Sequence, residues 1–388
     1  KTVILQTATN VNMILSFGRN IIDEALNRDV EIHILMSRYQ SNMESIKKDL
    51  KNMNVTIHKA SYMQELSIKA LFNNLKAIFE TYWLMLKLKP NIVHTRGSLM
   101  GYLGRITAFL ARVRNIYHHQ DDFFHREESA SRFKKKISQN IDYLLSKIST
   151  KLFFVSNTIM KEAERIGIES HKCVMVGHDL HPLFSKNFEK KNDEKHHLIK
   201  QGIPNSESKF IVGTIARIED FKGIDTILKV AKSIKSKEEN IKFIIRGNGS
   251  KYDKYKEMVD DLRLDDTVFM TKDFLPAEEM PTLFKSFDVF FLPTRREGFG
   301  MVFAEAMAMK VPVVCPKIYP VVEVVPEDLG YVIEPENVDK YTEAILDVYQ
   351  NQKKRVKITN KAFDYAVNRW GSKKSAKKVV KTLLESVD

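Results

Sequence analysis

The sequence predicts an α/β protein built from two doubly wound, Rossmann-like domains, each with a parallel β-sheet. Short β-rich runs alternate with helix-length periodic segments, which is the pattern of a parallel sheet covered by helices. A polar, charged stretch interrupts this alternation before it starts again. A chain of 388 residues that is 43% hydrophobic can also bury two cores. We therefore expect an amino-terminal domain over residues 1–185, a linker over 186–208 and a carboxy-terminal domain over 209–370.

The β-rich runs can be placed one by one. In the first domain we predict strands at residues 3–6, 31–35, 55–58, 92–94, 116–118, 152–155 and 174–176. In the second we predict strands at residues 210–215, 241–245, 268–270, 289–292 and 311–314. Ligands of open parallel sheets bind at the carboxyl ends of the strands. The loops that follow these runs are therefore where we expect functional residues.

The formal net charge of +13 is concentrated in the amino-terminal half. Residues 1–190 contain 28 Lys and Arg against 18 Asp and Glu, whereas residues 191–388 contain 34 against 31. Such a positive field attracts nucleic acid, an anionic membrane face or a lipid-diphosphate acceptor. No recognition motif for nucleic acid accompanies the charge, so we expect no nucleic-acid partner.

One segment of this basic half, residues 66–88, is amphipathic and helix-forming. Its apolar residues, such as Leu71 and Phe79, recur at helical spacing, with Lys69 and Lys76 nearby. Two interpretations stay open: a core helix with solvated lysines, and a helix that docks on an anionic membrane.

The compartment is predicted from two further features. No apolar run approaches the ~20 residues that span a bilayer. The two cysteines, Cys173 and Cys315, lie far apart in apolar runs, which favours packing roles in a reducing compartment. We expect a cytoplasmic protein, with peripheral contact of the basic domain with the inner membrane face as the open question.

The segment from residue 297 to residue 308 is the most informative part of the chain. Gly298 and Gly300 let the backbone approach a ligand closely, and the helix that follows offers free N–H groups that attract phosphate. Glu297 and Glu305 would repel phosphate, so we expect them to accept hydrogen bonds from sugar hydroxyls. The ligand that this combination indicates is a sugar nucleotide.

This segment resembles the glutamate, seven residues, glutamate signature of the retaining glycosyltransferases of family 4. These group 1 glycosyltransferases include bacterial capsule, lipopolysaccharide and exopolysaccharide enzymes. The resemblance implies the GT-B fold, in which two Rossmann-like domains face a cleft and a last helix, here residues 371–388, crosses back to the first domain. The chain departs from the family at Lys310, where a glycine usually precedes the Pro-Val pair.

The resemblance also implies a role for each residue of the segment. Glu297 would lie beside the donor sugar, and Glu305 would bind the ribose of the nucleotide. Backbone N–H groups of the glycine turn and the first helical residues would hold the sugar and the β-phosphate. These residues are Gly298, Phe299, Gly300, Met301 and Val302.

Other loops of the carboxy-terminal domain are expected to line the donor site. Arg217 and Lys222 follow the strand at 210–215 and resemble the family's Arg and Lys-Gly pair that holds the donor diphosphate. Gly247 and Asn248 follow the next strand, and we assign them to the lining of the site. By the same resemblance, Phe274 would lie near the nucleobase.

A histidine-rich loop follows a predicted strand of the first domain, with His118, His119 and Gln120 ahead of two acids. Imidazole and carboxylate can bind a metal together, but nearly contiguous residues in one loop make a weak site, so we predict no metal. The resemblance implies one histidine near the donor sugar. We choose His119, while His118 and Gln120 stay open as its counterpart. In the preceding loop, Arg96 could meet an acceptor phosphate.

Together these features predict a metal-independent, retaining hexosyltransferase without a cofactor. It would move a sugar from a nucleoside diphosphate, for which we expect UDP, to a hydroxyl of a saccharide, a lipid-linked saccharide or a protein. The expected setting is bacterial surface polysaccharide or glycoconjugate synthesis. Catalytic roles are assigned to Glu297, His119, Arg217 and Lys222. Two alternatives stay open: a non-hydrolysing UDP-sugar epimerase, and a non-catalytic sugar-nucleotide-binding protein.

Overall fold

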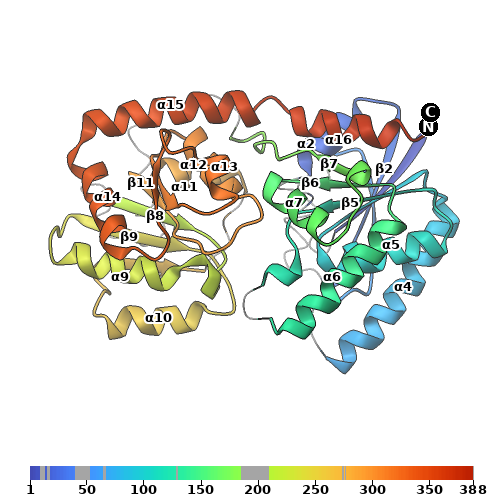
Figure 1. Cartoon of the computed structure of the whole chain (residues 1–388), viewed down its shortest axis with the longest axis horizontal. Helices are drawn as coiled ribbons and strands as arrows, with labels where there is room; N and C mark the ends of the chain where they lie inside the picture. Colours follow the sequence, from blue (N-terminus) through green and yellow to red (C-terminus); the bar gives the residue numbers. More distant parts are fainter. Residues whose placement is uncertain are drawn as a thin grey trace. The chain divides into compact units, whose positions relative to one another are not determined.

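The computed structural model describes residues 1–8, 14, 18–39, 53–63, 67–127, 130–184, 209–272, 275 and 277–387. The predicted linker at 186–208 and Phe274 lie outside these described residues. The chain divides into two compact units. The amino-terminal unit contains Lys1–His181 together with Lys373–Asp388, and the carboxy-terminal unit contains Pro182–Ser372 (Figure 1).

The amino-terminal unit is built on a seven-stranded, all-parallel sheet of order β3-β2-β1-β4-β5-β6-β7. Its strands are β1 (Thr2–Ala8), β2 (Val30–Ser37), β3 (Val55–Ala60), β4 (Ile92–Arg96), β5 (Asn115–Gln120), β6 (Lys151–Phe154) and β7 (Cys173–Met175). The strand order reverses between β1 and β4, which is where ligands of such sheets bind. The register pairs Ala8 with Arg96 and Arg96 with His119, so the ends of β1, β4 and β5 are level.

Helices cover both faces of this sheet (Figure 1). They are α2 (Arg19–Leu26), α4 (Ile68–Leu88), α5 (Ser98–Leu110), α6 (Arg132–Lys147), α7 (Asn157–Arg165) and α16 (Lys374–Leu384), with short 3₁₀ turns η1 (Phe124–Arg126) and η2 (Ser170–Lys172). Alternate strand residues face opposite sides. Ile4 packs in the core that includes residues of α2 and α16, whereas Leu5 packs in the core that includes residues of α4 and α5.

The last helix, α16, is held in the amino-terminal unit by its first turn. The carboxylate of Asp179 accepts hydrogen bonds from the backbone N–H groups of Ser375 (3.1 Å) and Ala376 (2.7 Å). These are two of the donors that a helix start leaves without an intrahelical acceptor. Val379 and Leu383 of the same helix are fully buried. Capping and apolar burial together attach residues 373–388 to this unit.

The carboxy-terminal unit has a six-stranded parallel sheet of order β10-β9-β8-β11-β12-β13. Its strands are β8 (Phe210–Ile215), β9 (Ile241–Arg246), β10 (Val268–Thr271), β11 (Val289–Phe291), β12 (Val313–Pro316) and β13 (Tyr331–Ile333). Its helices are α9 (Ile224–Lys235), α10 (Tyr252–Asp261), α11 (Met280–Lys285), α12 (Met301–Ala308), α13 (Val321–Val324), α14 (Val338–Gln350) and α15 (Gln352–Trp370), with 3₁₀ turns η4 (Asp220–Lys222) and η5 (Ala277–Glu279).

The predicted fold class, two Rossmann-like units with parallel sheets, is confirmed. Each predicted strand overlaps an observed one. Strand β13 has no counterpart in the prediction, because it is a three-residue strand at the sheet edge and each of its residues is only partly buried. In the part of the chain that the structure describes, no helix has both the length and the apolar character to cross a bilayer.

The amphipathic segment forms α4, but its large apolar residues are not core residues. Leu71 and Phe79 are exposed, and the helix instead buries smaller side chains such as Ala77 and Thr81 against the sheet. The interpretation of this apolar face as part of the core is therefore wrong.

Candidate donor and acceptor sites

In the carboxy-terminal unit, the predicted site residues lie on the loops that leave β8 and β11 and at the start of α12. Arg217 follows β8, and Lys222 is the last residue of the turn η4 before α9. Glu297 lies between β11 and α12. Strands β8 and β11 are neighbours in the sheet, so their carboxyl ends bring these loops together.

Lys222 and Glu297 are in direct contact. Lys222 Nζ donates a hydrogen bond of 2.5 Å to Glu297 Oε1. The side chain of Lys222 is 12% exposed and that of Glu297 is 11% exposed. A charge pair at this depth constrains both side chains more than a surface pair does, because little water competes for either group. The two predicted catalytic residues, 75 positions apart, thus share one site.

Three cationic side chains of this site lie near the aromatic ring of Phe221. The guanidinium carbons of Arg217 and Arg296 lie 5.6 Å and 4.8 Å from the ring centroid, and Lys222 Nζ lies 5.3 Å from it. Cations within about 6 Å of an aromatic face are attracted to its negative charge distribution. Phe221 and Arg296 were not among the predicted site residues, although Phe221 directly precedes Lys222 and Arg296 directly precedes Glu297.

Arg295 fastens the loop after β11 to neighbouring elements. It donates two parallel hydrogen bonds to Asp225 of α9 (2.9 and 2.8 Å), and its Nε donates to Glu336 Oε1 at 2.7 Å. Hydrogen bonding to Asp225 is the largest cause that raises the pKa of Arg295. Such bidentate pairs fix geometry as well as charge. Arg295 therefore positions its neighbours Arg296 and Glu297.

Two glycines are required by close backbone contacts between loops. A Cβ at Gly223, which has φ +71°, would lie 2.1 Å from the carbonyl oxygen of Pro293. A Cβ at Gly247, with φ +154°, would lie 1.7 Å from the carbonyl oxygen of Ala216. Close packing against the loop after β8 thus explains why position 247 is a glycine. Gly247 is one of the residues that we predicted to line the donor site. Its neighbour Asn248 accepts a hydrogen bond from Ile218 N–H through its backbone oxygen (3.1 Å).

The glycine turn leads directly into α12. Gly300 is the N-cap residue, with φ +94°, a conformation that glycine adopts without strain. Met301 and Val302 form the first turn, whose N–H groups have no acceptor within the helix. Gly298 and Phe299 lie between Glu297 and this helix start. At the helix start, the N–H groups of Met301 and Val302 are therefore placed to bind an anion.

Glu305 lies on the second turn of α12. Its side chain retains some contact with solvent, but burial alone raises the pKa of its carboxyl to about 7. Among the residues that the structure describes, no side chain or backbone group forms a hydrogen bond or ion pair with this carboxylate. A carboxylate held without a partner in a protein site is a candidate ligand-binding group.

In the amino-terminal unit, the histidine doublet lies on β5, and its members have different environments. His118 Nδ1 is 2.8 Å from Thr95 Oγ1, and His118 Nε2 is 2.9 Å from Gln120 Oε1. Gln120 in turn donates to the backbone oxygen of Asp122 at 2.5 Å. A Cβ at Gly101 of α5 would lie 2.5 Å from the His118 ring. Both His118 and Gln120 are therefore committed to contacts within the unit.

His119 faces the other side of the sheet and is 2% exposed. Neither of its ring nitrogens has a hydrogen-bond partner among the described residues. Its ring lies near His94 (5.8 Å between centroids), His178 (6.1 Å) and Phe153 (5.9 Å). Burial, followed by the charge of Arg96, lowers the pKa of His119 well below its ordinary value, so the ring is neutral at pH 7.

Arg96 ends β4 next to this cluster. Its Nε and Nη2 donate to the two carboxylate oxygens of Asp121 at 3.1 and 3.2 Å. An acceptor phosphate would therefore meet a guanidinium that is already paired with a carboxylate. Within the described ranges, no three His, Cys, Asp or Glu side chains come together in a way that could hold a metal ion.

The chain is similar in sequence to known proteins over most of its length. Residues 195–365 match the family model described as glycosyl transferases group 1. The capsular polysaccharide biosynthesis glycosyltransferase CapM of Staphylococcus aureus is 24% identical over 315 residues, which cover 78% of this chain and 79% of that protein.

Solved structures show the same architecture. Anabaena Alr3699/HepE, crystallised with UDP and glucose, matches 99% of this chain and all of its own with a TM-score of 0.82 at 16% identity. A glycosyltransferase from Rickettsia africae matches all of this chain and 99% of its own with a TM-score of 0.77 at 15% identity. Residues 195–365, most of the carboxy-terminal unit, thus match the group 1 glycosyltransferase family model, and the chain as a whole has the two-domain fold of solved glycosyltransferases.

Proposed function

We propose that this glycosyltransferase moves a sugar from a UDP-sugar donor to an acceptor hydroxyl with retention of anomeric configuration, and that UDP is the leaving group. The observation that carries the proposal is the contact between Lys222 and Glu297, beside the amide groups at the start of α12. A cation suits a diphosphate and a carboxylate suits the hydroxyls of a sugar. UDP is the expected nucleotide because a protein of the same fold was crystallised with UDP and glucose.

The diphosphate gains negative charge as the bond to the sugar breaks. Arg217, Lys222 and the N–H groups of residues 298–302 stabilise that charge, and each strong preorganised donor is worth roughly 3 kcal/mol of barrier. In this proposal Lys222 exchanges its bond with Glu297 for a phosphate oxygen when the donor binds. Glu297 then accepts hydrogen bonds from the sugar and forms no covalent intermediate. No metal is needed for this charge stabilisation.

Two further residues, one in each unit, have proposed roles. Glu305 binds the ribose hydroxyls, because its carboxylate has no other partner among the described residues. His119 hydrogen-bonds the sugar or the acceptor hydroxyl as a neutral imidazole, since its two nitrogens lack partners within the described chain. The front-face transfer of the acceptor proton to a leaving-group oxygen follows from the family resemblance. Gly247, Asn248 and Phe274 remain proposed lining residues.

We propose that the acceptor is a saccharide or lipid-linked saccharide of a bacterial surface polysaccharide. This follows from the relative whose name places it in capsular polysaccharide biosynthesis. A protein acceptor is the second possibility that the residues leave open. A cytoplasmic location, where nucleotide sugars are made, completes the proposal.

The proposal is tested first without an acceptor. UDP binding is measured by calorimetry, and a panel of nucleotide sugars is assayed for slow hydrolysis to identify the donor. Glu297→Ala should fold as the wild type and lose hydrolysis and transfer, whereas Glu257→Ala, an exposed carboxylate on α10, should retain both. Full activity of Glu297→Ala, or interconversion of UDP-sugars without acceptor, would refute the proposed transfer mechanism.

A further inference from the structure

Exposed apolar side chains gather on three helices of the amino-terminal unit. Among the described residues, 18 large hydrophobic side chains are exposed, and 14 of them lie on α4, α5 and α6. We call these 14 the apolar face: Ile68, Leu71, Phe72, Leu75, Phe79, Trp83, Leu86, Ile106, Phe109, Leu110, Phe133, Ile137, Ile141 and Leu144. Single exposed hydrophobic residues are ordinary, but a contiguous group of this kind marks an interaction site.

The part of the apolar face on α4 is a continuous stripe. Its exposed residues recur three or four positions apart from Ile68 to Leu86, and their exposed fractions run from 77% at Ile68 to 36% at Leu86. At 1.5 Å per residue the stripe is about 27 Å long. Trp83 and Phe79 within it lie edge to face, with centroids 6.0 Å apart. The opposite side of α4 provides the residues that the core uses, such as Met85.

Helices α5 and α6 continue the face. On α6, Phe133, Ile137, Ile141 and Leu144 share one side of the helix, because they also recur at three or four positions. Helix α5 contacts both α4 and α6, and the three helices lie next to one another in Figure 1. The exposed apolar side chains of all three helices therefore belong to one region of the unit.

The same helices carry almost only positive charge. Residues 68–89, 98–114 and 132–147 contain 12 Lys and Arg but only two acids, Glu80 and Asp142. Asp142 is buried, and Glu80 accepts hydrogen bonds from Ser61 and Arg38. The lysines of α4 and most of the basic residues of α6 are exposed. The charge that the apolar face presents to a partner is therefore positive.

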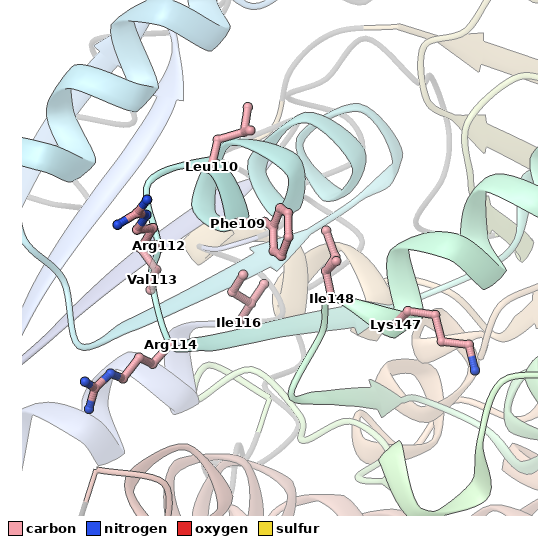
Figure 2. Close-up of a pocket in the computed structure, with 8 residues that line it drawn as sticks. All are labelled: Phe109, Leu110, Arg112, Val113, Arg114, Ile116, Lys147 and Ile148. Carbon is pink, nitrogen blue, oxygen red and sulfur yellow. The ribbon is translucent and has the colours of Figure 1, made fainter.

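A cavity of about 600 Å³ opens beside the face, at the carboxyl end of α5. Phe109, Ile116 and Ile148 form its apolar centre, with Arg112 and Arg114 on one side of them and Lys147 on the other (Figure 2). Lys147 forms an ion pair with Glu169. Neither arginine has an ion-pair partner within the described part of the chain. An apolar pocket rimmed by cations matches an anionic headgroup joined to an acyl chain.

The charge distinguishes between the possible occupants of this surface. A second copy of the chain would place two positive faces against each other, which is repulsive. An anionic bilayer complements both features at once: apolar and aromatic side chains enter the interface while lysines reach the headgroups. We propose that α4, α5 and α6 dock the protein on an anionic membrane through the apolar face, with a lipid phosphate beside Arg112 and Arg114.

Trp83 provides a direct reporter of this docking. The chain has two tryptophans, and Trp83 is exposed whereas Trp370 is buried. Vesicles of phosphatidylcholine with 40% phosphatidylglycerol should shift the tryptophan emission to shorter wavelength, and the shift should be lost in Trp83→Phe. Vesicles of phosphatidylcholine alone should bind at least about tenfold more weakly, given about 1 kcal/mol per basic residue near an anionic surface. Neither measurement needs a donor or an acceptor, so the result is independent of the proposed function.

Vesicle sedimentation of variants locates the surface. Phe72→Gln combined with Phe79→Gln, and Arg112→Glu combined with Arg114→Glu, should each lower the bound fraction at least about tenfold. Matched controls on the carboxy-terminal unit, Val356→Gln and Lys353→Glu, should bind as the wild type; both residues are exposed on α15. Circular dichroism checks that the variants fold.

Three results would overturn the proposal. The first is failure of the wild-type protein to bind anionic vesicles. The second is an equal loss of binding in the controls. The third is a dimer, or a complex with an acidic protein, that covers the face and is disrupted by the Phe72→Gln and Phe79→Gln pair while vesicle binding is unchanged.

Discussion

The loops at the carboxyl ends of the two sheets differ in how their polar groups are satisfied. In the carboxy-terminal unit, the side chains of Arg217, Lys222 and Arg296 lie near the ring of Phe221, and Lys222 is bonded to Glu297. In the amino-terminal unit, His119 is buried and its ring nitrogens have no partner among the described residues. Paired charges that reach solvent suit a phosphate, which can replace one partner of the pair. Buried, neutral imidazole nitrogens without partners among the described residues suit hydroxyl groups, which both donate and accept hydrogen bonds.

The largest expected effect concerns the charged site. Lys222→Ala should lower kcat at least about 100-fold, because it removes a donor worth roughly 3 kcal/mol to the departing diphosphate. The variant should still fold, but its free energy of unfolding should fall, because Glu297, whose side chain is 11% exposed, loses its contact with Lys222. Steady-state assays with the identified donor measure the loss, and Lys232→Ala, an exposed lysine on α9, is the matched control. A kcat within threefold of wild type would remove Lys222 from the mechanism.

The histidine doublet gives the second effect, in which stability and activity should separate. His118→Ala should lower the free energy of unfolding by about 2 kcal/mol, because it leaves Thr95 and Gln120 without their shared partner. His119→Phe should retain or raise stability and lose transfer, because it removes buried ring nitrogens that have no hydrogen-bond partner among the described residues. Urea unfolding and activity assays on both variants test this contrast. Loss of stability in both, with activity retained in His119→Phe, would contradict it.

Glu305 should make the pH dependence of stability opposite in sign to that of His119. Burial raises the pKa of Glu305 from 4.5 to about 7, so the folded state binds the proton more tightly and stability falls as pH rises through this range. The lowered pKa of His119 instead costs stability as pH falls below its ordinary value of 6.5. Glu305→Gln should therefore raise the free energy of unfolding at pH 8 by about 2 kcal/mol, less than the full shift implies because the carboxyl retains solvent contact.

Urea unfolding at pH 5 and pH 8, with calorimetric titration of UDP, measures this prediction. The stabilisation should be present at pH 8 and nearly absent at pH 5, and UDP affinity should fall. Equal stability of Glu305→Gln and wild type at both pH values would show that the carboxylate is better solvated than its surroundings indicate.

The smallest effect lies at the end of α12. Lys310 has φ +56°, a conformation that favours glycine, and Val311 N–H donates to the backbone oxygen of Ala306 as in a Schellman motif. Lys310→Gly should raise stability by about 0.5–1 kcal/mol. The gain is reduced by loss of the contact between Lys310 Nζ and the Phe363 ring, 4.6 Å from its centroid. Thermal unfolding measures it, and a lower melting temperature would mean that the ring contact is the stronger effect.

The sequence alone determined the fold class and the position of most strands, because the alternation of apolar runs and helical periodicity is a local property of the chain. It also determined where Glu297 and Glu305 lie relative to each other, because only one turn and the start of one helix separate them. It missed β13, since a short edge strand has too little apolar pattern to be recognised.

Only the tertiary structure decided how these residues are paired. The contact of Lys222 with Glu297 joins residues 75 positions apart, and Phe221 acquires its role only through three cations around one ring. Strand alternation turns His118 toward Gly101 and His119 to the opposite side, so the choice within the doublet depends on which helix packs on which face. The same reason applies to α4, whose sequence shows an apolar side but cannot show that the sheet packs against the other one.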